Sequence, residues 1–362
     1  MRIVTFGEIM GRFCPDGFLR LKQAMPGRLN LTFAGAEANV AASLSILGRS
    51  SIFVSALPQN ILADACISNL KGLGINTDFI IRTEKGRLGL YFVETGANQR
   101  PSKVVYDRSG ASITLVETSE YDWNRIFKDA GWFHTTGITP SLSKIAADSA
   151  LYAVKKAKEL GLTVSCDLNF RKTLWQWDES LKAKELAQKV MRELLPYVDV
   201  VIANEEDASD VLGIKAGETD VYAGKLDVGK YPVVAREIIG QFPNVSKVAI
   251  TLRESISATH NNWGAMLFDR DSDQAFFAPL EGDNYVPYQI KNIVDRVGCG
   301  DAFAAGLIFA LSGDEYATLG EKLSFAVAAS CLAHSIVGDF NYSTKAEIES
   351  LMGGSVAGRV IR

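Results

Sequence analysis

The stretch DRVGCGDAFAAG occupies residues 295–306 and continues into the apolar run LIFAL. Its glycines Gly298 and Gly300 let backbone N–H groups turn toward one point, and the helical composition that follows predicts an electropositive helix start. This pattern indicates a site for an anion. Asp301 then has two interpretations: a general base beside a bound phosphate, or an ordinary capping residue at the start of a helix.

The overall composition is that of an ordinary globular protein. The chain has 362 residues, of which 47% are hydrophobic and 22% charged, enough to bury a large core. With 38 basic against 42 acidic residues, the formal charge of -4 argues against a nucleic-acid partner. The five cysteines and three histidines are scattered, which predicts neither a disulfide framework nor a zinc site. A strand-like run begins at Arg2 without a leader, and no apolar run could span a bilayer, so we expect a cytoplasmic protein with no membrane partner.

Short β-branched runs alternate with helical patterns along most of the chain. This rhythm predicts an α/β fold with a mostly parallel central sheet covered by helices on both faces. Two regions, at about 10–33 and 88–107, have strand patterns without intervening helices, which predicts a small separate β-sheet. Such a sheet is typical of a lid over the carboxyl ends of parallel strands. The helices are expected at 36–47, 61–73, 144–160 and 181–195.

Three further stretches place polar side chains where predicted strands end. In FAGAEANVAASLSILG (33–48), Gly35 would admit a ligand close to the backbone and Asn39 could turn its amide into the same crevice. In DLNFRKTLW (167–175), the planar fork of Arg171 suits a carboxylate or a phosphate. In VVIANEED (200–207), Asn204 and Asp207 suit water-mediated Mg²⁺ binding. Each stretch taken alone also fits a plainer interpretation: a βα turn, a surface ion pair or a charged helix start.

Taken in order, these stretches resemble the ribokinase-like (PfkB) sugar kinases, whose C-terminal signature is D-T-x-G-A-G-D. DRVGCGD matches it except at Arg296 and Cys299, and no P-loop or GxGxxG fingerprint competes with it. The resemblance covers nearly the whole chain. It implies one ribokinase-like kinase domain over residues 1–362, with ATP and Mg²⁺. It further implies Asp301 as the base, with the backbone amides of Gly298, Cys299 and Gly300 as the anion hole.

Within this family the likeness is greatest to 2-keto-3-deoxygluconate kinases, which phosphorylate the terminal hydroxyl of a six-carbon sugar acid to give the 6-phosphate. It rests on the stretches GAEANVA, LGLYF, YDRSGAS, GITPSLS, DLNFRKTLW and GDF. Arg108 and Arg171 supply more positive charge than the binding of a neutral sugar needs, which favours a substrate that carries a carboxylate. Asn39 is added because its amide could turn into the same crevice. The expected substrate-binding residues are Gly35, Asn39, Tyr91, Tyr106, Arg108, Ile138, Arg171 and Asp339.

The residues that bind the nucleotide are harder to assign from the family pattern than those that bind the sugar. Residues 251–264 are expected to form a loop longer than the usual glycine turn beneath the nucleotide, so the nucleotide preference is not fixed. Asp295 is expected to face the nucleotide or to support its loop, and Arg296 to reach the ATP phosphates or a neighbouring acid. The resemblance also implies a homodimer or higher homo-oligomer and leaves open a monovalent cation near the 295–297 backbone. The implied nucleotide-binding residues are Asn204, Thr251, Arg253, Gly264 and Gly300.

Three functions stay open at this point. The leading hypothesis is an ATP-dependent kinase of 2-keto-3-deoxygluconate. A kinase of fructose, another neutral ketose or a related aldonate gains support if Arg108 and Arg171 lie away from the pocket. A non-catalytic sugar- or nucleotide-binding regulator is the alternative from another class, and Asp301 argues against it because a binder needs no base beside its anion site.

Overall fold

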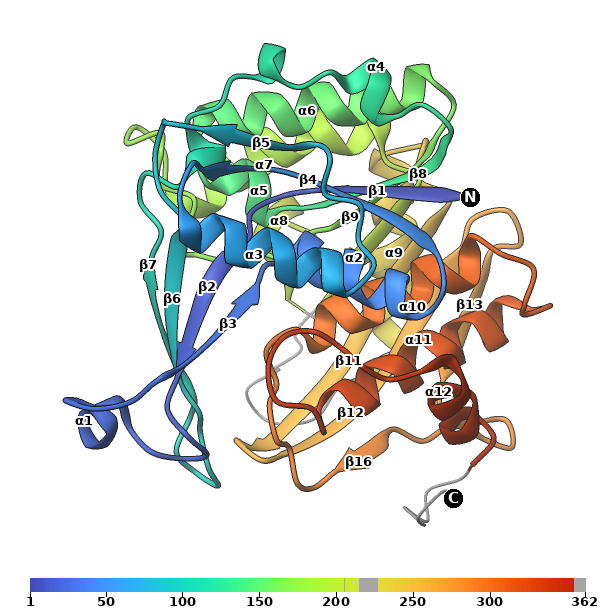
Figure 1. Ribbon diagram of the computed structural model, residues 1–362. Coiled ribbons are helices and arrows are strands. Elements are labelled where there is room, and N and C mark those ends of the chain that lie inside the picture. Colours follow the sequence, from blue (N-terminus) through green and yellow to red (C-terminus); the bar gives the residue numbers. More distant parts are fainter. Residues whose placement is uncertain (205, 215–226, 355–362) are drawn as a thin grey trace.

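Ten strands form the central sheet of the computed structural model, which describes residues 1–204, 206–214 and 227–354 (Figure 1). The strand order is β13–β12–β11–β10–β9–β8–β1–β4–β5, and β16 pairs with β12. The strands from β11 through β5 run parallel, whereas β12, β13 and β16 pair antiparallel. The expectation of a mostly parallel sheet is therefore confirmed. The strands are β1 Arg2–Phe6, β4 Ser50–Pro58, β5 Ile80–Thr83, β8 Ala130–Thr136, β9 Thr163–Asp167, β10 Val200–Ala203, β11 Lys247–Ser257, β12 His260–Asp269, β13 Gln274–Ala278 and β16 Tyr288–Ile290.

Helices cover both faces of this sheet. Alternate strand residues point to opposite faces, so Ile3 and Val200 belong to one apolar core while their neighbours Val4 and Val201 belong to another. Helices α2, α10 and α11 pack on the first core, and α6, α7 and α9 on the second. The helices are α2 Ala36–Ile46, α3 Ile61–Gly72, α6 Lys144–Glu159, α7 Ala183–Leu194, α9 Tyr231–Gln241, α10 Cys299–Leu311, α11 Leu319–Ala333 and α12 Lys345–Met352, with short ones at α1 Leu21–Ala24, α4 Trp123–Ile126, α5 Ile138–Ser141 and α8 Asp207–Leu212.

A second, four-stranded sheet projects from the edge of the main body (Figure 1). Its order is β3–β2–β6–β7, with β2 and β6 parallel and the other pairs antiparallel. This is the small sheet that the sequence predicts, and we call it the lid. Its strands are β2 Met10–Cys14, β3 Asn30–Ala34, β6 Gly89–Glu94 and β7 Lys103–Asp107; a two-stranded ribbon, β14 Leu280–Glu281 with β15 Asn284–Tyr285, lies apart from it.

One expectation about local structure is wrong. Residues 251–264 are not a loop: β11 and β12 form a long antiparallel hairpin, in which Leu252 pairs with Gly264 and Arg253 with Trp263. Residues on both strands of the hairpin bury their side chains in the cores, which favours extended pairing over an open loop. Among the described residues, no helix combines the length and the apolar character needed to cross a bilayer.

Gly306 fixes how closely α10 approaches α11. A Cβ built on Gly306 would lie 2.9 Å from the Cα of Ala326 and 3.2 Å from the Cβ of Ala329. The two helices therefore pack at a distance that only a residue without a side chain allows. This contact holds α10, the helix that begins at the glycine motif Gly298–Gly300.

Gly306→Ala is expected to lower the free energy of unfolding by about 1–3 kcal/mol, because the added methyl group forces α10 away from α11. Alanine is otherwise the better helix former, so Gly240→Ala in α9 is the matched control. A Cβ on Gly240 meets no atom within 4 Å, and we expect that variant to be neutral or to gain up to about 1 kcal/mol. Urea unfolding measures both, and equal stability of the two variants would contradict the packing argument.

Candidate active site

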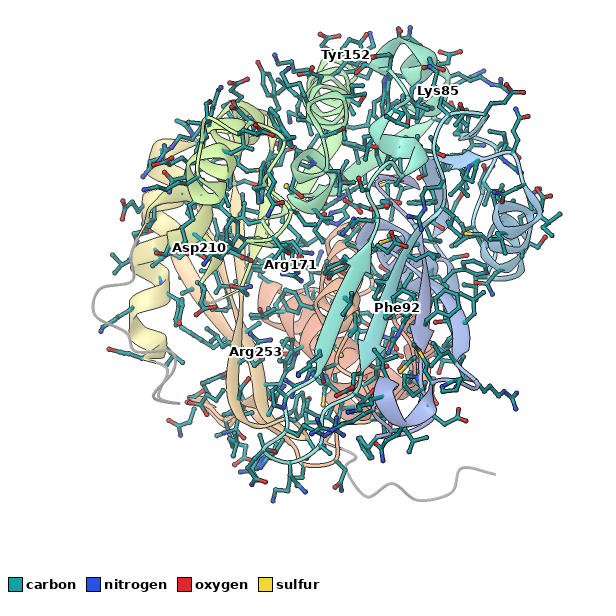
Figure 2. All side chains as sticks on the ribbon, turned by 90° about the vertical axis from the view of Figure 1, so that its left-hand side faces the viewer. Lys85, Phe92, Tyr152, Arg171, Asp210 and Arg253 are labelled. Atoms are coloured by element: carbon teal, nitrogen blue, oxygen red, sulfur yellow. The ribbon has the colours of Figure 1, made fainter. Side chains whose placement is uncertain are left out.

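A cavity of about 400 Å³ opens at the carboxyl ends of the parallel strands, beneath the lid. In Figure 2, Arg171 and Arg253 lie between the lid strand that carries Phe92 and the helix that carries Asp210. The cavity brings together residues that are far apart in sequence, because neighbouring parallel strands end at the same sheet edge. The sequence-predicted residues that line it are Gly35, Asn39, Tyr91, Tyr106, Arg108, Ile138, Arg171, Asn204, Asp207, Thr251, Arg253, Gly298, Cys299, Gly300, Asp301 and Asp339.

Gly264 is not among the residues that line the cavity, and its assignment to the nucleotide side stays a prediction. It lies inside β12, opposite Leu252 of β11. A Cβ on Gly264 would lie 2.3 Å from the hydroxyl oxygen of Tyr285 and 2.7 Å from the carbonyl oxygen of Ala278. The absence of a side chain there serves close packing behind the hairpin, while Thr251 and Arg253 on the partner strand do reach the cavity.

The glycine motif forms the turn that starts α10. Gly298 precedes the helix with φ +86°, in the left-handed region that favours glycine. A Cβ on Gly298 would lie 2.3 Å from the carbonyl oxygen of Asp339, so a side chain is excluded by both conformation and space. The N–H groups of Cys299 and Gly300 belong to the first turn of α10 and have no partner within the helix. This end of the cavity can therefore hold an anion.

The Cys299 thiol contributes no nucleophile. It is buried, and burial raises its pKa well above the usual range, with neighbouring acids adding to the rise. A helix start tends to lower the pKa of a thiol, but at Cys299 desolvation outweighs the helix dipole. Only the backbone of this residue serves the site.

Asp301 is the third residue of α10 and lies in the cavity wall. Its Oδ2 accepts a hydrogen bond of 2.6 Å from Nδ2 of Asn39, whose Oδ1 in turn accepts one of 3.2 Å from the N–H of Gly35. Burial raises the pKa of Asp301 to about 6, while the Asn39 bond lowers it. At neutral pH the group is thus a carboxylate that can accept a proton.

On the lid side, Arg108 and Asp339 already have protein partners. Nε of Arg108 donates to Oε2 of Glu8 at 2.9 Å, and its guanidinium lies 5.3 Å from the centre of the Tyr106 ring. The Tyr91 hydroxyl donates to Oδ2 of Asp339 at 2.8 Å. Glu8 therefore balances the charge of Arg108. The sequence analysis missed Glu8, although an acid just after the first strand is a usable signal at a sheet edge of this kind.

Arg171 differs from Arg108 in having no acidic partner among the described residues. Its Nη1 donates to the carbonyl oxygen of Phe170, and the side chain is exposed to the cavity. Its charge lowers the pKa values of Asp167, Asp207 and Asp301 without a direct ion pair. A free guanidinium at this position can bind a carboxylate or a phosphate with two hydrogen bonds.

Glu37 is a second buried acid that the sequence analysis missed. Its Oε1 accepts hydrogen bonds from the N–H and hydroxyl of Thr136, at 3.0 and 2.7 Å, and from the hydroxyl of Thr139 at 2.8 Å. Burial raises its pKa to about 7. These bonds tie the start of α2 to the end of β8 beneath the cavity, so the role of Glu37 is to position the Gly35 turn and Asn39.

Asn204 and Asp207 form a capped turn after β10. Oδ1 of Asn204 accepts from the N–H of Asp207 at 2.9 Å, and Oδ2 of Asp207 accepts from the N–H of Asn204 at 3.0 Å. Oδ1 of Asp207 accepts from the N–H of Phe170 at 3.1 Å, which joins this turn to the 167–171 segment. Within the described residues, no group of three or more His, Cys, Asp or Glu side chains could hold a metal ion. The magnesium role of this pair stays a prediction.

Asp295 supports its loop, as one of the two expectations for it stated. Its Oδ1 accepts from the N–H groups of Arg296 and Val297 at 2.8 and 3.2 Å. Arg296 has no ion-pair partner among the described acids, and its contact with the ATP phosphates stays a prediction. Its Nη2 donates to the carbonyl oxygens of Ser257 and Ala258 at 3.2 and 2.8 Å. The guanidinium therefore joins the motif to the β11–β12 turn while lining the cavity.

The chain is similar to known carbohydrate kinases in sequence and in structure. Residues 2–234 match the model of a family described as pfkB family carbohydrate kinase. The chain is 30% identical to a 2-dehydro-3-deoxygalactonokinase of Haloferax volcanii over 98% of both chains. It is 27% identical to a 2-dehydro-3-deoxygluconokinase of Bacillus subtilis, over 84% of this chain and 81% of that protein. The crystal structure of a 2-dehydro-3-deoxygluconokinase from Thermotoga maritima is 45% identical, with a TM-score of 0.87, and covers 98% of this chain and 100% of its own.

Asn39→Ala is expected to raise the pKa of Asp301 above its value of about 6, because the lost amide donor stabilised only the ionised form. A hydrogen bond to a charged group of this kind corresponds to a shift of about one unit, or ~1.4 kcal/mol. Carbon-13 NMR titration of the carboxyl signals measures it, with Asp301→Asn identifying the resonance. An unchanged or lowered pKa in Asn39→Ala would show that the amide does not control this carboxylate.

Proposed function

The chain belongs to the pfkB family of carbohydrate kinases, and on that basis we propose that it phosphorylates the terminal hydroxyl of 2-keto-3-deoxygluconate with ATP, giving the 6-phosphate. The observation that carries this proposal is the position of Asp301: an ionisable carboxylate lies in the cavity wall beside the amides that begin α10. A regulator that only binds sugar or nucleotide would need no such base.

In the proposed reaction, Asp301 accepts the proton of the terminal hydroxyl as that oxygen attacks the γ-phosphorus of ATP in line. Asn39 holds the carboxylate in place through its 2.6 Å hydrogen bond. The amides around Gly298, Cys299 and Gly300 stabilise the charge that develops on the transferred phosphoryl group. These amides already belong to the first turn of α10 beside the cavity.

The substrate proposal depends on cations in the cavity. Arg108 and Arg171 both line it, which supports a sugar acid over fructose or another neutral ketose. Glu8 already pairs with Arg108, so Arg171 is the group with a guanidinium free for the substrate carboxylate. A second candidate is 2-keto-3-deoxygalactonate, because the Haloferax volcanii relative, 30% identical over 98% of both chains, is named as a kinase of the galacto form.

The surroundings of Asn204 and Asp207 fit a hydrated Mg²⁺. The pKa of Asp167 is raised well above its usual range by burial and by repulsion from Asp207 and Asp301, and a divalent cation would relieve that repulsion. Asn204 and Asp207 would hold the ion through water, since their oxygens also accept backbone hydrogen bonds. When bound, Mg²⁺ would neutralise negative charge on the ATP phosphates.

Two further expectations stay predictions. A monovalent cation near the 295–297 backbone would need ligands other than the Asp295 carboxylate, because each of its oxygens already accepts two hydrogen bonds. A homodimer through the lid is supported by apolar side chains exposed on the lid strands, namely Leu31, Val104 and Val105.

Asp301→Asn is expected to lower kcat by about 10²- to 10⁴-fold and to leave sugar-acid binding largely unchanged, because the amide keeps the shape and loses the basicity. In the unsubstituted enzyme, kcat/KM should rise with pH through about 6, since the base works only when ionised. A coupled ADP-release assay across pH 5–8 measures both effects. Substantial turnover by Asp301→Asn, or a rate that falls as the pH rises through 6, would remove Asp301 from the role of base.

Arg171→Gln is expected to raise the KM for 2-keto-3-deoxygluconate by about 10- to 100-fold, the effect of losing a hydrogen-bonded charge pair. The same assay over the gluco and galacto sugar acids and fructose tests substrate class, and the activity on fructose should change much less. Lys172→Gln is the matched control, because it removes a positive charge from the next residue, which does not line the cavity. An equal effect of Arg171→Gln on sugar acids and fructose would contradict the carboxylate assignment.

A further inference from the structure

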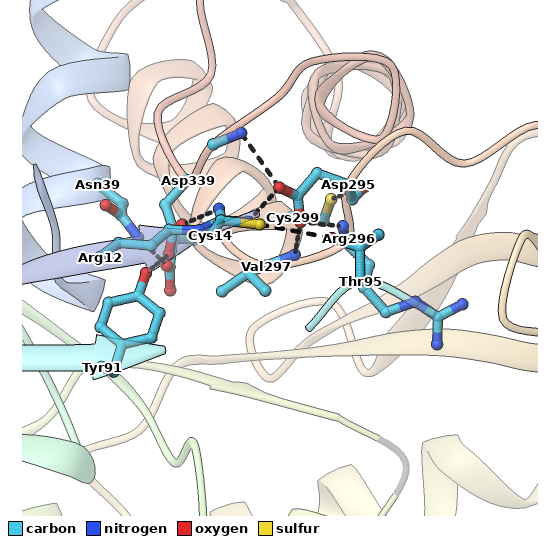
Figure 3. A network of polar contacts seen from close by, with 12 residues as sticks. Arg12, Cys14, Asn39, Tyr91, Thr95, Asp295, Arg296, Val297, Cys299 and Asp339 are labelled. Atoms are coloured by element: carbon cyan, nitrogen blue, oxygen red, sulfur yellow. Dashed lines mark hydrogen bonds and ion pairs between the residues drawn. The ribbon is translucent and has the colours of Figure 1, made fainter. Parts of the chain in front are cut away.

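Arg12, on lid strand β2, is buried to 2% exposure although it carries a charge. Figure 3 shows its contacts with Asp295 and Asp339. Its guanidinium lies between two carboxylates of the main body: Nη2 donates to Oδ2 of Asp295, and Nη1 donates to Oδ1 of Asp339. A buried cation is tolerated only when it is paired. Here Arg12 pairs with Asp295, which comes before the Gly298–Gly300 motif, and with Asp339, which packs against Gly298. No part of the proposed reaction uses this arginine.

The first of these acids holds the front of the motif. Besides Arg12, the Asp295 carboxylate accepts the N–H groups of Arg296, Val297 and Gly338, the last at 3.1 Å. Residues 295–297, which lead into Gly298, are thus held around the Asp295 carboxylate. Its negative charge is balanced by Arg12, which comes from the lid.

The second acid holds the back of the motif. The carbonyl oxygen of Asp339 lies against Gly298, at 2.3 Å from where a Cβ would be. The Asp339 carboxylate lines the cavity and accepts hydrogen bonds from Arg12 and from the Tyr91 hydroxyl, both on lid strands. Any shift of this segment therefore moves the Gly298 turn as well.

We propose that Arg12 is a positioning residue, which aligns the Gly298–Gly300 amides and the Asp339 carboxylate by fixing both to the lid. This inference rests on the proposed function for its effect on catalysis. The planar fork of the guanidinium is essential, because its two arms bind different acids at once. A lysine keeps the charge but offers one ammonium group, which cannot span both carboxylates in the same way.

Arg12→Lys is expected to lower kcat by about 10- to 100-fold, the effect of misplacing reacting groups by about an ångström. The pH profile should change too. Burial raises the pKa of Asp339 and Arg12 lowers it, so Arg12→Met should add a second ionisation to the acid limb and make that limb steeper. A residue with a merely structural role would lower the amount of folded enzyme without altering the shape of the profile.

Hydrogen–deuterium exchange of the full-length protein without ligands tests the positioning directly. In Arg12→Lys the amides of residues 295–301 should exchange faster than in the unsubstituted protein. Arg100→Met is the matched control: it removes the Arg100–Glu94 ion pair, which lies within the lid and does not reach the motif. Urea unfolding confirms that each variant is folded, and Asp295→Asn removes the same link if Arg12→Met fails to fold.

The two experiments separate the failures of the two proposals. The positioning role would be overturned if the amides of residues 295–301 exchanged at the same rate in Arg12→Lys as in Arg100→Met. It would also be overturned if Arg12→Lys kept kcat within twofold of the unsubstituted enzyme and Arg12→Met left the shape of the pH profile unchanged. If the unsubstituted enzyme phosphorylates no sugar acid, the proposed function fails, while the exchange measurement still decides whether Arg12 fixes the loop.

Discussion

The contact between Gly298 and the carbonyl oxygen of Asp339 constrains the whole site. It needs a residue with positive φ and no side chain, because a Cβ would lie 2.3 Å from that oxygen. Only with this turn can α10 begin at Cys299 with its first amides at the cavity and Asp301 in its first turn. The close packing of Gly306 against Ala326 then holds the helix at the depth that this start requires.

Glu37 and Asp301 are both buried acids at the site, but their hydrogen bonds suit them to different roles. Glu37 accepts three hydrogen bonds from Thr136 and Thr139, and its oxygen is used up in joining α2 to β8. Asp301 accepts one from Asn39, which lowers a pKa that burial alone would raise further, and leaves oxygen lone pairs toward the cavity. The first arrangement suits a structural joint, and the second suits a proton acceptor that is ionised at neutral pH.

The sequence predicts those parts of the fold and site that depend on local pattern. Helix α6 ends within one residue of its predicted range, 144–160, and residues at strand ends meet in the cavity because parallel strands end at one edge. Pairings between distant segments leave no such pattern. Arg12 and Asp339 are 327 residues apart, and nothing around Arg12 in β2 signals a buried partner. The surroundings of Gly264 are likewise set by strand register and not by its neighbours in sequence.

The charges around the cavity are divided, and the division argues for a nucleotide. Asp167, Asp207 and Asp301 gather on one side, where the repulsion of the other two carboxylates adds to burial in raising the pKa of Asp167. On the other side, burial and the charge of Arg253 lower the pKa of Arg296. The charge of Arg171 lowers the pKa values of all three acids and so opposes the effect of burial. A phosphate chain would be attracted to the arginines, and a divalent cation bound with it would lessen the repulsion among the acids.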